Sequence, residues 1–379
     1  MSHPCKVSRR DLLKAAAAGV GAGLVSPAAS ATVVSNYPAN KWGTPGLYPA
    51  QVVAMYHSGS TVNFQVQTGP VQQMIRNGLM ALTGTNNYVT GWRQFVGPGD
   101  VVGIKINPNG NGYTQSSPAV MMEIITGLML AGVNPRNIIV YERYAQILSW
   151  VAWFFPSWVQ TASASPQYED DQTSISGYDP NHYVDLPLFT DWQIQEPNYQ
   201  NNPVYTRSYA AQWITRRVNK VINVAVLKNH NAAGVTLAMK NLTHGCTNNV
   251  DRSHPSWGNY YTTYIPAVLS MPVIRYKAVL HIVDGIHGLY EGGPNGPGQY
   301  TWENKTMYFA TDAVAVDRVG WRVIDAERVA NGMPISQDSP PFIGQTGNLQ
   351  QPQYILSAGA AGLGESRDNY INLRTTVLG

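Results

Sequence analysis

Apolar and polar positions follow a pattern typical of a sheet covered by helices. Short apolar runs of strand length occupy residues 51–56, 101–106, 138–141, 221–227, 277–283 and 306–310. Segments with apolar residues at helical spacing lie at residues 71–82, 118–131, 236–242, 260–269 and 313–328. Because strands and helices alternate, the sequence predicts an α/β fold, a three-layer sandwich with a largely parallel sheet.

The unit over residues 101–141 is the best marked. Ser117 can cap a helix that has Pro118 at its first position and stops at Gly132. An apolar run precedes this helix and another follows it. Strand, helix and strand therefore occur at βαβ spacing, which predicts that the two strands pair in parallel.

Two segments break the pattern. Residues 32–50 are rich in Pro, Gly and Asn and are expected to form an extended arm or linker. Residues 145–215 carry many aromatic residues without steady periodicity, which favours an insertion or lid. Its aromatic side chains more often pack on the main domain than line a cleft. Its acidic run, residues 169–171, is expected to be a solvated loop. Residues 51–379 are otherwise expected to form a single domain, whose last forty residues carry no assignment.

The N-terminus has the features of an export signal. The pair Arg9 and Arg10 precedes a charge-free run at residues 15–25, and the small-x-small sequence at residues 29–31 follows. The run is too short to span a bilayer. Residues 1–31 are therefore predicted to be a twin-arginine signal peptide. The expected partner is the twin-arginine translocase, and the expected location is periplasmic or extracellular, with no membrane anchor after cleavage.

Charge and cysteine content exclude several function classes. Cleavage after Ala31 would remove four basic residues and one acidic residue, so 25 basic and 22 acidic residues become 21 and 21. A nucleic-acid partner is not expected of such a balance. Cys246 would then be the only cysteine. A single thiol allows neither an internal disulfide nor a cysteine-ligated iron–sulfur cluster within one chain.

Candidate chemistry lies where the apolar runs end, because open α/β sheets bind ligands beyond the carboxyl ends of their strands. Four runs end in polar residues and are expected to converge on one rim. The residues at these four ends are Lys105 and Asn107, Lys228 and His230, Asp284, and Asp312. Nearby segments add Lys240, Asn241, His254 and Glu291.

Three segments resemble a known family. Residues 226–242 (VLKNHNAAGVTLAMKNL), 282–285 (IVDG) and 311–317 (TDAVAVD) are similar to the signature of the DUF362 family, a domain of unknown function. The resemblance covers residues 101–328 and implies a single α/β domain. By position it implies a site made of Lys228, His230, Lys240, Asn241, His254, Asp284 and Asp317. Many relatives carry a cysteine-rich, ferredoxin-like segment, which this chain lacks.

The leading hypothesis is a metal-dependent enzyme that acts on a small anionic substrate. His230, His254 and Asp284 would hold a divalent metal ion, for which zinc, iron or manganese suits the mixed ligands. The substrate carboxylate or phosphate would be bound by Lys105, Asn107, Lys228, Lys240, Asn241 and Asp312. Asp317 or Glu291 would be the general base.

Two other readings of the same residues stay open. A metal-free enzyme would use Lys228 or Lys240 as an acid–base or Schiff-base group, because crowded, buried lysines lose basicity. A periplasmic binding or accessory protein would capture the anion without turnover. The chain has no dinucleotide-binding glycine motif, Walker loop or Gly-x-Ser-x-Gly elbow, so no nucleotide cofactor is expected.

Overall fold

The computed structural model describes residues 31–110, 112–254, 260–336 and 352–379. Nearly all of the predicted signal peptide, residues 1–30, lies outside the described residues. Within the described part, no helix is both long enough and apolar enough to cross a membrane.

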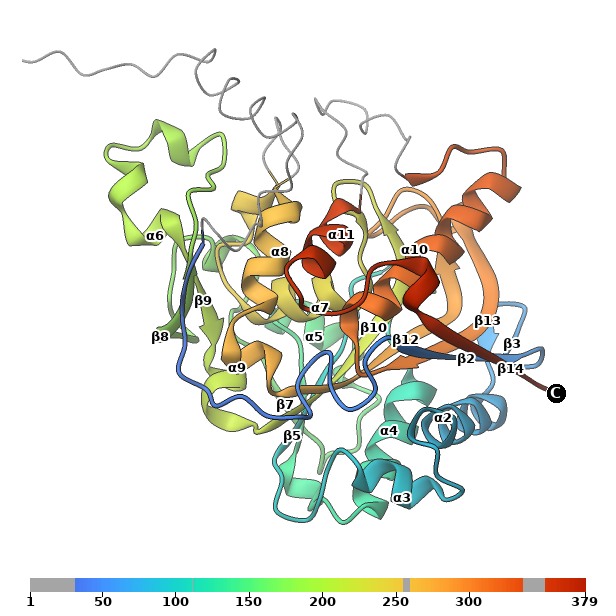
Figure 1. Ribbon diagram of the computed structural model, residues 1–379. Helices are drawn as coiled ribbons and strands as arrows, with labels where there is room; N and C mark the ends of the chain where they lie inside the picture. The colour runs from blue at the N-terminus through green and yellow to red at the C-terminus, as the bar shows by residue number, and fades with distance from the viewer. Residues whose placement is uncertain (1–30, 111, 255–259, 337–351) are drawn as a thin grey trace, which may run out of the picture.

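A large, mostly parallel sheet forms the centre of the molecule (Figure 1). Its strands, in spatial order, are β14 (Asn372–Leu378), β2 (Gln51–His57), β13 (Thr301–Ala310), β12 (Ala278–Leu289), β10 (Lys220–His230), β5 (Val102–Lys105), β6 (Ile138–Tyr141) and β7 (Gln160–Ala162). Strand β13 runs antiparallel to both of its neighbours, and the short β11 (Gly234–Val235) pairs antiparallel with β10. The other neighbours on this path pair in parallel, as predicted.

Helices cover both faces of this sheet (Figure 1). One face carries α2 (Thr68–Thr83), α3 (Tyr88–Arg93) and α4 (Pro118–Leu130), and the other carries α7 (Leu237–Cys246), α8 (Tyr261–Leu269), α10 (Ala313–Ala330) and α11 (Gln353–Ala360). Alternate strand residues serve the two faces: Val53 and Met55 join the core under α2 and α4, whereas Val52 and Ala54 join the core under α7 and α10. The three-layer α/β sandwich is therefore confirmed.

The βαβ unit forms as its sequence indicates. The Ser117 hydroxyl accepts a hydrogen bond from the Val120 amide, and Pro118 occupies the first turn of α4. Strands β5 and β6 then pair in parallel, with Val102 opposite Ile138. The βαβ prediction is thus confirmed in its cap, its helix and its strand pairing.

The insertion contains more regular structure than its composition indicates. It holds α5 (Ala145–Ala152), β8 (Tyr178–Asp185) and β9 (Arg207–Ala211), and its strand β7 extends the central sheet. Strand β1 (Thr32–Val34), from the N-terminal arm, pairs with β8. The Gly- and Pro-rich C-terminal region likewise supplies α11 and β14.

The order of the strands reverses between β5 and β10. From β5 the chain proceeds to β6 and β7 on one side, then returns to β10 and β12 on the other. Loops after strands that turn to opposite sides leave a crevice between them, which is where such sheets bind ligands. The prediction that four strand ends share this rim is wrong for β13, because β13 is antiparallel to β12 and carries Thr311 and Asp312 to the opposite edge.

Candidate functional site

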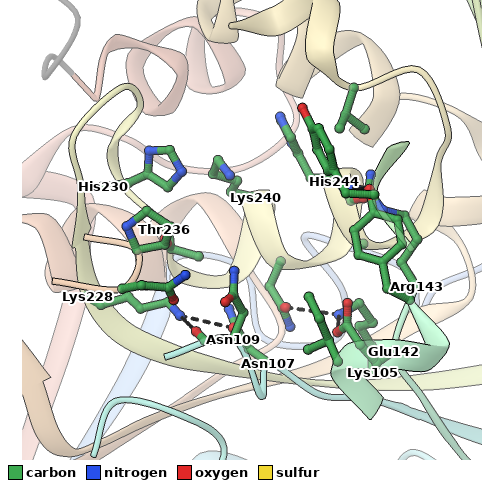
Figure 2. Close-up of a pocket in the computed structure, with 18 of the residues that line it drawn as sticks. Lys105, Asn107, Asn109, Glu142, Arg143, Lys228, His230, Thr236, Lys240 and His244 are labelled. Carbon is green, nitrogen blue, oxygen red and sulfur yellow. Dashed lines mark hydrogen bonds and ion pairs between the residues drawn. The ribbon is translucent and has the colours of Figure 1, made fainter. Parts of the chain in front are cut away.

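A cavity of about 410 Å³ lies at this reversal (Figure 2). Its walls come from the ends of β5, β6 and β10, from α5 and α7, and from loops that follow α7 and β12. The lining residues are Lys105, Asn107, Asn109, Glu142, Arg143, Tyr144, Gln146, Ile147, Trp150, Tyr168, Lys228, His230, Thr236, Lys240, Asn241, His244, Gly245, Val250, His254, Pro294 and Asn295. The predicted residues Lys105, Asn107, Lys228, His230, Lys240, Asn241 and His254 are among them.

Positive charge dominates this lining. It contains four Lys and Arg side chains, Lys105, Arg143, Lys228 and Lys240, against one carboxylate, Glu142. Lysine and arginine are seldom buried unless they are paired. The electrostatic character of the cavity therefore depends on which of the four cations has a partner.

Lys105 forms an ion pair with Glu142. Its ammonium Nζ lies 2.7 Å from Glu142 Oε2 and 3.2 Å from Asn241 Oδ1 (Figure 2). The stem of Lys105 packs against Gly245 on α7, where an added Cβ would lie 2.0 Å from Lys105 Cε. Glu142 thus forms a buried ion pair with Lys105, and its charge also acts on Lys228.

Arg143 forms an ion pair with a carboxylate that does not line the cavity. Its Nε lies 3.6 Å from Asp171 Oδ2, and its guanidinium donates to the Thr247 carbonyl oxygen at 3.0 Å. Asp171 is buried and also accepts a hydrogen bond from the Tyr178 hydroxyl. The prediction that residues 169–171 form a solvated loop is therefore wrong for Asp171, which faces inward because Arg143 needs a counterion.

Lys228 and Lys240 form no ion pair within the described residues. Lys228 Nζ donates to Asn107 Oδ1 at 3.1 Å and to the Asn109 carbonyl oxygen. Lys240 Nζ forms no hydrogen bond in the same part of the chain and lies 5.7 Å from the centre of the Tyr261 ring. Burial lowers the pKa of each ammonium to about 7. The charge of Glu142 opposes this shift at Lys228, whereas neighbouring cations add to it at both lysines. Among the described residues, these two lysines are the cations of the cavity that have no carboxylate in direct contact.

Three histidines stand near Lys240. Burial lowers the pKa of His230 and of His244 well below the ordinary value, and that of His254 to about 3. Their rings are therefore neutral at physiological pH. The rings of His230 and His254 lie 6.1 Å apart, and those of His244 and His254 lie 5.6 Å apart.

Hydrogen-bond partners assign the ring protons of two of them. His230 Nδ1 accepts from the amides of Ala232 and Ala233 at 3.2 and 3.1 Å, which leaves the proton on Nε2. His254 Nδ1 lies 3.1 Å from the Val250 carbonyl oxygen, which can only accept, so its proton is on Nδ1. His230 therefore presents a donor through Nε2, and His254 presents an acceptor through Nε2.

Two of the predicted carboxylates lie outside the cavity, where they accept hydrogen bonds from backbone amides. Asp284 accepts from the Ser117 amide at 2.9 Å and from the Ile286 amide at 3.3 Å. Asp312 caps α10, where its Oδ1 accepts from the amides of Val314 and Ala315. Neither residue lines the cavity.

The two carboxylates predicted as general bases are also engaged elsewhere. Asp317 on α10 accepts from the Ala238 amide at 2.6 Å and from the Met239 amide at 2.9 Å, in the first turn of α7. Glu291 forms an ion pair with Arg328. Across residues 31–110, 112–254, 260–336 and 352–379, no group of three or more His, Cys, Asp and Glu side chains is placed to hold a metal ion.

Glu142, Arg143 and His244 are among the lining residues that lie outside the set predicted from the sequence. Glu142 and Arg143 directly follow the apolar run at residues 138–141, so the strand-end argument used for the other runs also applies to them. His244 lies one helical turn after Lys240 on α7. The sequence thus contains a signal for each of the three.

Comparison with known proteins gives a partial family match and no activity. No curated protein shows significant similarity. A solved protein from Thermotoga maritima, 10% identical, aligns over 57% of this chain and 50% of its own, with a TM-score of 0.33. This chain therefore covers about half the length of that protein. Residues 176–322 match the family described as "Domain of unknown function (DUF362)". This match covers less than half of the chain and agrees with the resemblance found in its sequence.

Proposed function

We propose that the cavity binds a small carboxylate or phosphate compound and that Lys240 is the acid–base group that acts on it. One observation carries the proposal: Lys228 and Lys240 are buried in the same cavity without a carboxylate partner in the described chain. A buried cation without a counterion is costly. An anionic ligand would recover part of that cost, so such a cavity favours anions over neutral molecules.

The two lysines differ in their contacts and hence in their proposed roles. Asn107 and Asn109 hold Lys228 in place, which suits a group that orients the anion. Lys240 Nζ forms no hydrogen bond within the described residues and is free to exchange a proton or to attack a carbonyl carbon. A pKa of about 7 supplies both protonation states at neutral pH, as general acid–base catalysis requires.

Thermal unfolding with added anions tests the proposal. Phosphate and acetate are expected to raise the unfolding temperature of the protein, and more at pH 6 than at pH 9. The sign follows from the lysine pKa of about 7: below it the ammonium form attracts the anion, and above it the neutral amine does not. Sodium chloride at equal ionic strength is the control. Equal shifts at the two pH values, or none at pH 6, would contradict the proposal.

Turnover is separated from simple capture by covalent trapping. If Lys240 attacks a carbonyl substrate, its amine nitrogen forms an imine with the carbonyl carbon and water leaves. Borohydride would reduce that imine to a stable amine, which mass spectrometry of peptides would locate on Lys240. Stabilisation by an α-keto acid with neither an adduct nor a product would instead indicate a binding protein, for which the same contacts suffice.

A metal-dependent version of this function stays a prediction. Of its three predicted ligands, His254 offers a free lone pair at Nε2, and His230 would first have to release the two amides at its Nδ1. Asp284 would have to leave the Ser117 amide. Metal analysis of untagged protein tests this version: near-stoichiometric metal that is lost in a His254→Ala variant would support it.

We propose further that the protein acts after export. Support comes from the arginine pair, the charge-free run and the cleavage sequence at residues 1–31. In a host with a twin-arginine system, an Arg9→Lys, Arg10→Lys variant should accumulate uncleaved in the cytoplasm. Normal processing of that variant would contradict this part of the proposal.

A further inference from the structure

Helix α5 presents different residues to the core and to the cavity. Leu148 and Val151 are buried and belong to the core under α4. Ile147 and Trp150, on another side of the same helix, line the cavity. Residues three apart share a helix face, so Ile147 and Trp150 form a short apolar wall held in place by the buried pair.

This wall is unusually exposed for its composition. Trp150 keeps 50% of its surface accessible, and Tyr168, which also lines the cavity, keeps 37%. The Tyr168 hydroxyl donates to Asp251 at 2.7 Å, and its ring meets the Tyr144 ring edge to face with centroids 5.9 Å apart. Two large aromatic side chains therefore lie at a cavity wall and are only partly covered by the described protein.

The cations and the apolar side chains come from different elements. Lys105, Lys228 and Lys240 project from strand ends and from α7, whereas Ile147, Trp150, Tyr168 and Val250 come from α5 and from loops. The cavity volume of about 410 Å³ is in the range of sites for small organic molecules. Inorganic phosphate or acetate alone would leave much of this volume empty.

We infer that the anion bound here is part of a larger molecule with a flat ring, and that the ring lies against Trp150 while the anionic group meets Lys228 and Lys240. This inference rests on the proposed anion-binding function and adds the class of substrate. Both an aryl ring and the apolar face of a sugar have the required shape. The shared chemistry is a flat apolar face attached to a carboxylate or phosphate.

Matched ligand pairs test the inference by titration calorimetry at pH 6. Phenyl phosphate and glucose 6-phosphate are compared with inorganic phosphate, and benzoate and glucuronate with acetate. At least one ring compound is expected to bind about threefold to tenfold more tightly than its ring-free partner, as a ring contact of ordinary strength would give. Whether the aryl or the sugar compounds gain identifies the type of ring.

Two tryptophan variants make the test specific. Trp150→Ala should remove the advantage of the ring compounds and leave binding of inorganic phosphate unchanged. Trp153→Ala is the matched control, because Trp153 lies on the same segment, is 79% exposed and does not line the cavity. Trp150→Phe retains a ring and should retain most of the advantage.

The outcomes separate this inference from the proposal on which it rests. If inorganic phosphate and acetate bind but rings bring no gain, or if the gain survives in Trp150→Ala, the ring inference is overturned and anion binding stands. If none of the six anions binds, both are overturned. A gain that is lost in Trp150→Ala and kept in Trp153→Ala supports both.

Discussion

Replacing Lys240 with methionine is expected to abolish anion-dependent stabilisation and, at the same time, to make the ligand-free protein more stable. Methionine keeps the length of the stem and fits a helix, but it removes a buried charge that has no counterion in the described chain. A gain of at least about 1 kcal/mol is expected, because each pKa unit by which burial disfavours the charged form corresponds to about 1.4 kcal/mol. Urea unfolding at pH 6, with and without phosphate, measures both effects.

The increase in stability of the Lys240→Met protein should depend on pH. Burial places the pKa of Lys240 at about 7 in the folded protein, against 10.5 when it is exposed. The cost of the buried charge is therefore complete below pH 7 and disappears as the pH rises to about 10.5. Lys41→Met, at an exposed lysine outside the cavity, should change neither stability nor anion binding. A Lys240→Met protein that is less stable than wild type at pH 6 would show that the charge is compensated.

Replacing Asp317 with alanine is expected to destabilise the fold strongly without removing a catalytic group. The carboxylate of Asp317 accepts two buried amides at the start of α7, the helix that carries Lys240 and His244. Leaving both donors unsatisfied costs about 2–6 kcal/mol, since each costs about 1–3 kcal/mol. Urea unfolding should show this loss, and phosphate should still stabilise the fraction that remains folded.

The same experiment separates this role from that of a general base. Glu327→Ala, at a partly exposed position on the same helix, is the control and should shift the urea midpoint little. An Asp317→Ala protein with an unchanged midpoint but no turnover of a substrate would contradict the structural role. Asp317→Asn, which retains one acceptor, should fall between wild type and Asp317→Ala in stability.

Much of the fold follows from local sequence patterns. The helix α4 was predictable because a capping serine, a first-turn proline and an apolar stripe coincide within residues 117–132. Strand β9 and strand β14 were not, because their residues lack alternation and their stability comes from pairing with β8 and β2. The direction of β13 depends on its neighbours in space, which no local pattern records.

Three of the four cations of the candidate site were predicted from the sequence, whereas the carboxylates that were predicted lie elsewhere. Lys105, Lys228 and Lys240 are found by asking which residues end the apolar runs or follow them closely. The same question also selects Asp284 and Asp312, because a carboxylate that holds backbone amides occupies the same sequence positions as one that binds a ligand. The two kinds of carboxylate can be distinguished only in the three-dimensional structure, where the amides that they accept from are visible.

The reversal of strand order at β5 and β10 gives the cavity a composite origin. Lys105, Glu142 and Arg143 precede β10 in the chain, whereas Lys240 and His254 follow it. Neither portion of the chain holds a complete site by itself. A ligand with its anionic group at Lys240 and its ring against Trp150 would connect the two portions reversibly. Its binding would therefore stabilise the whole sheet and not only the residues that it contacts.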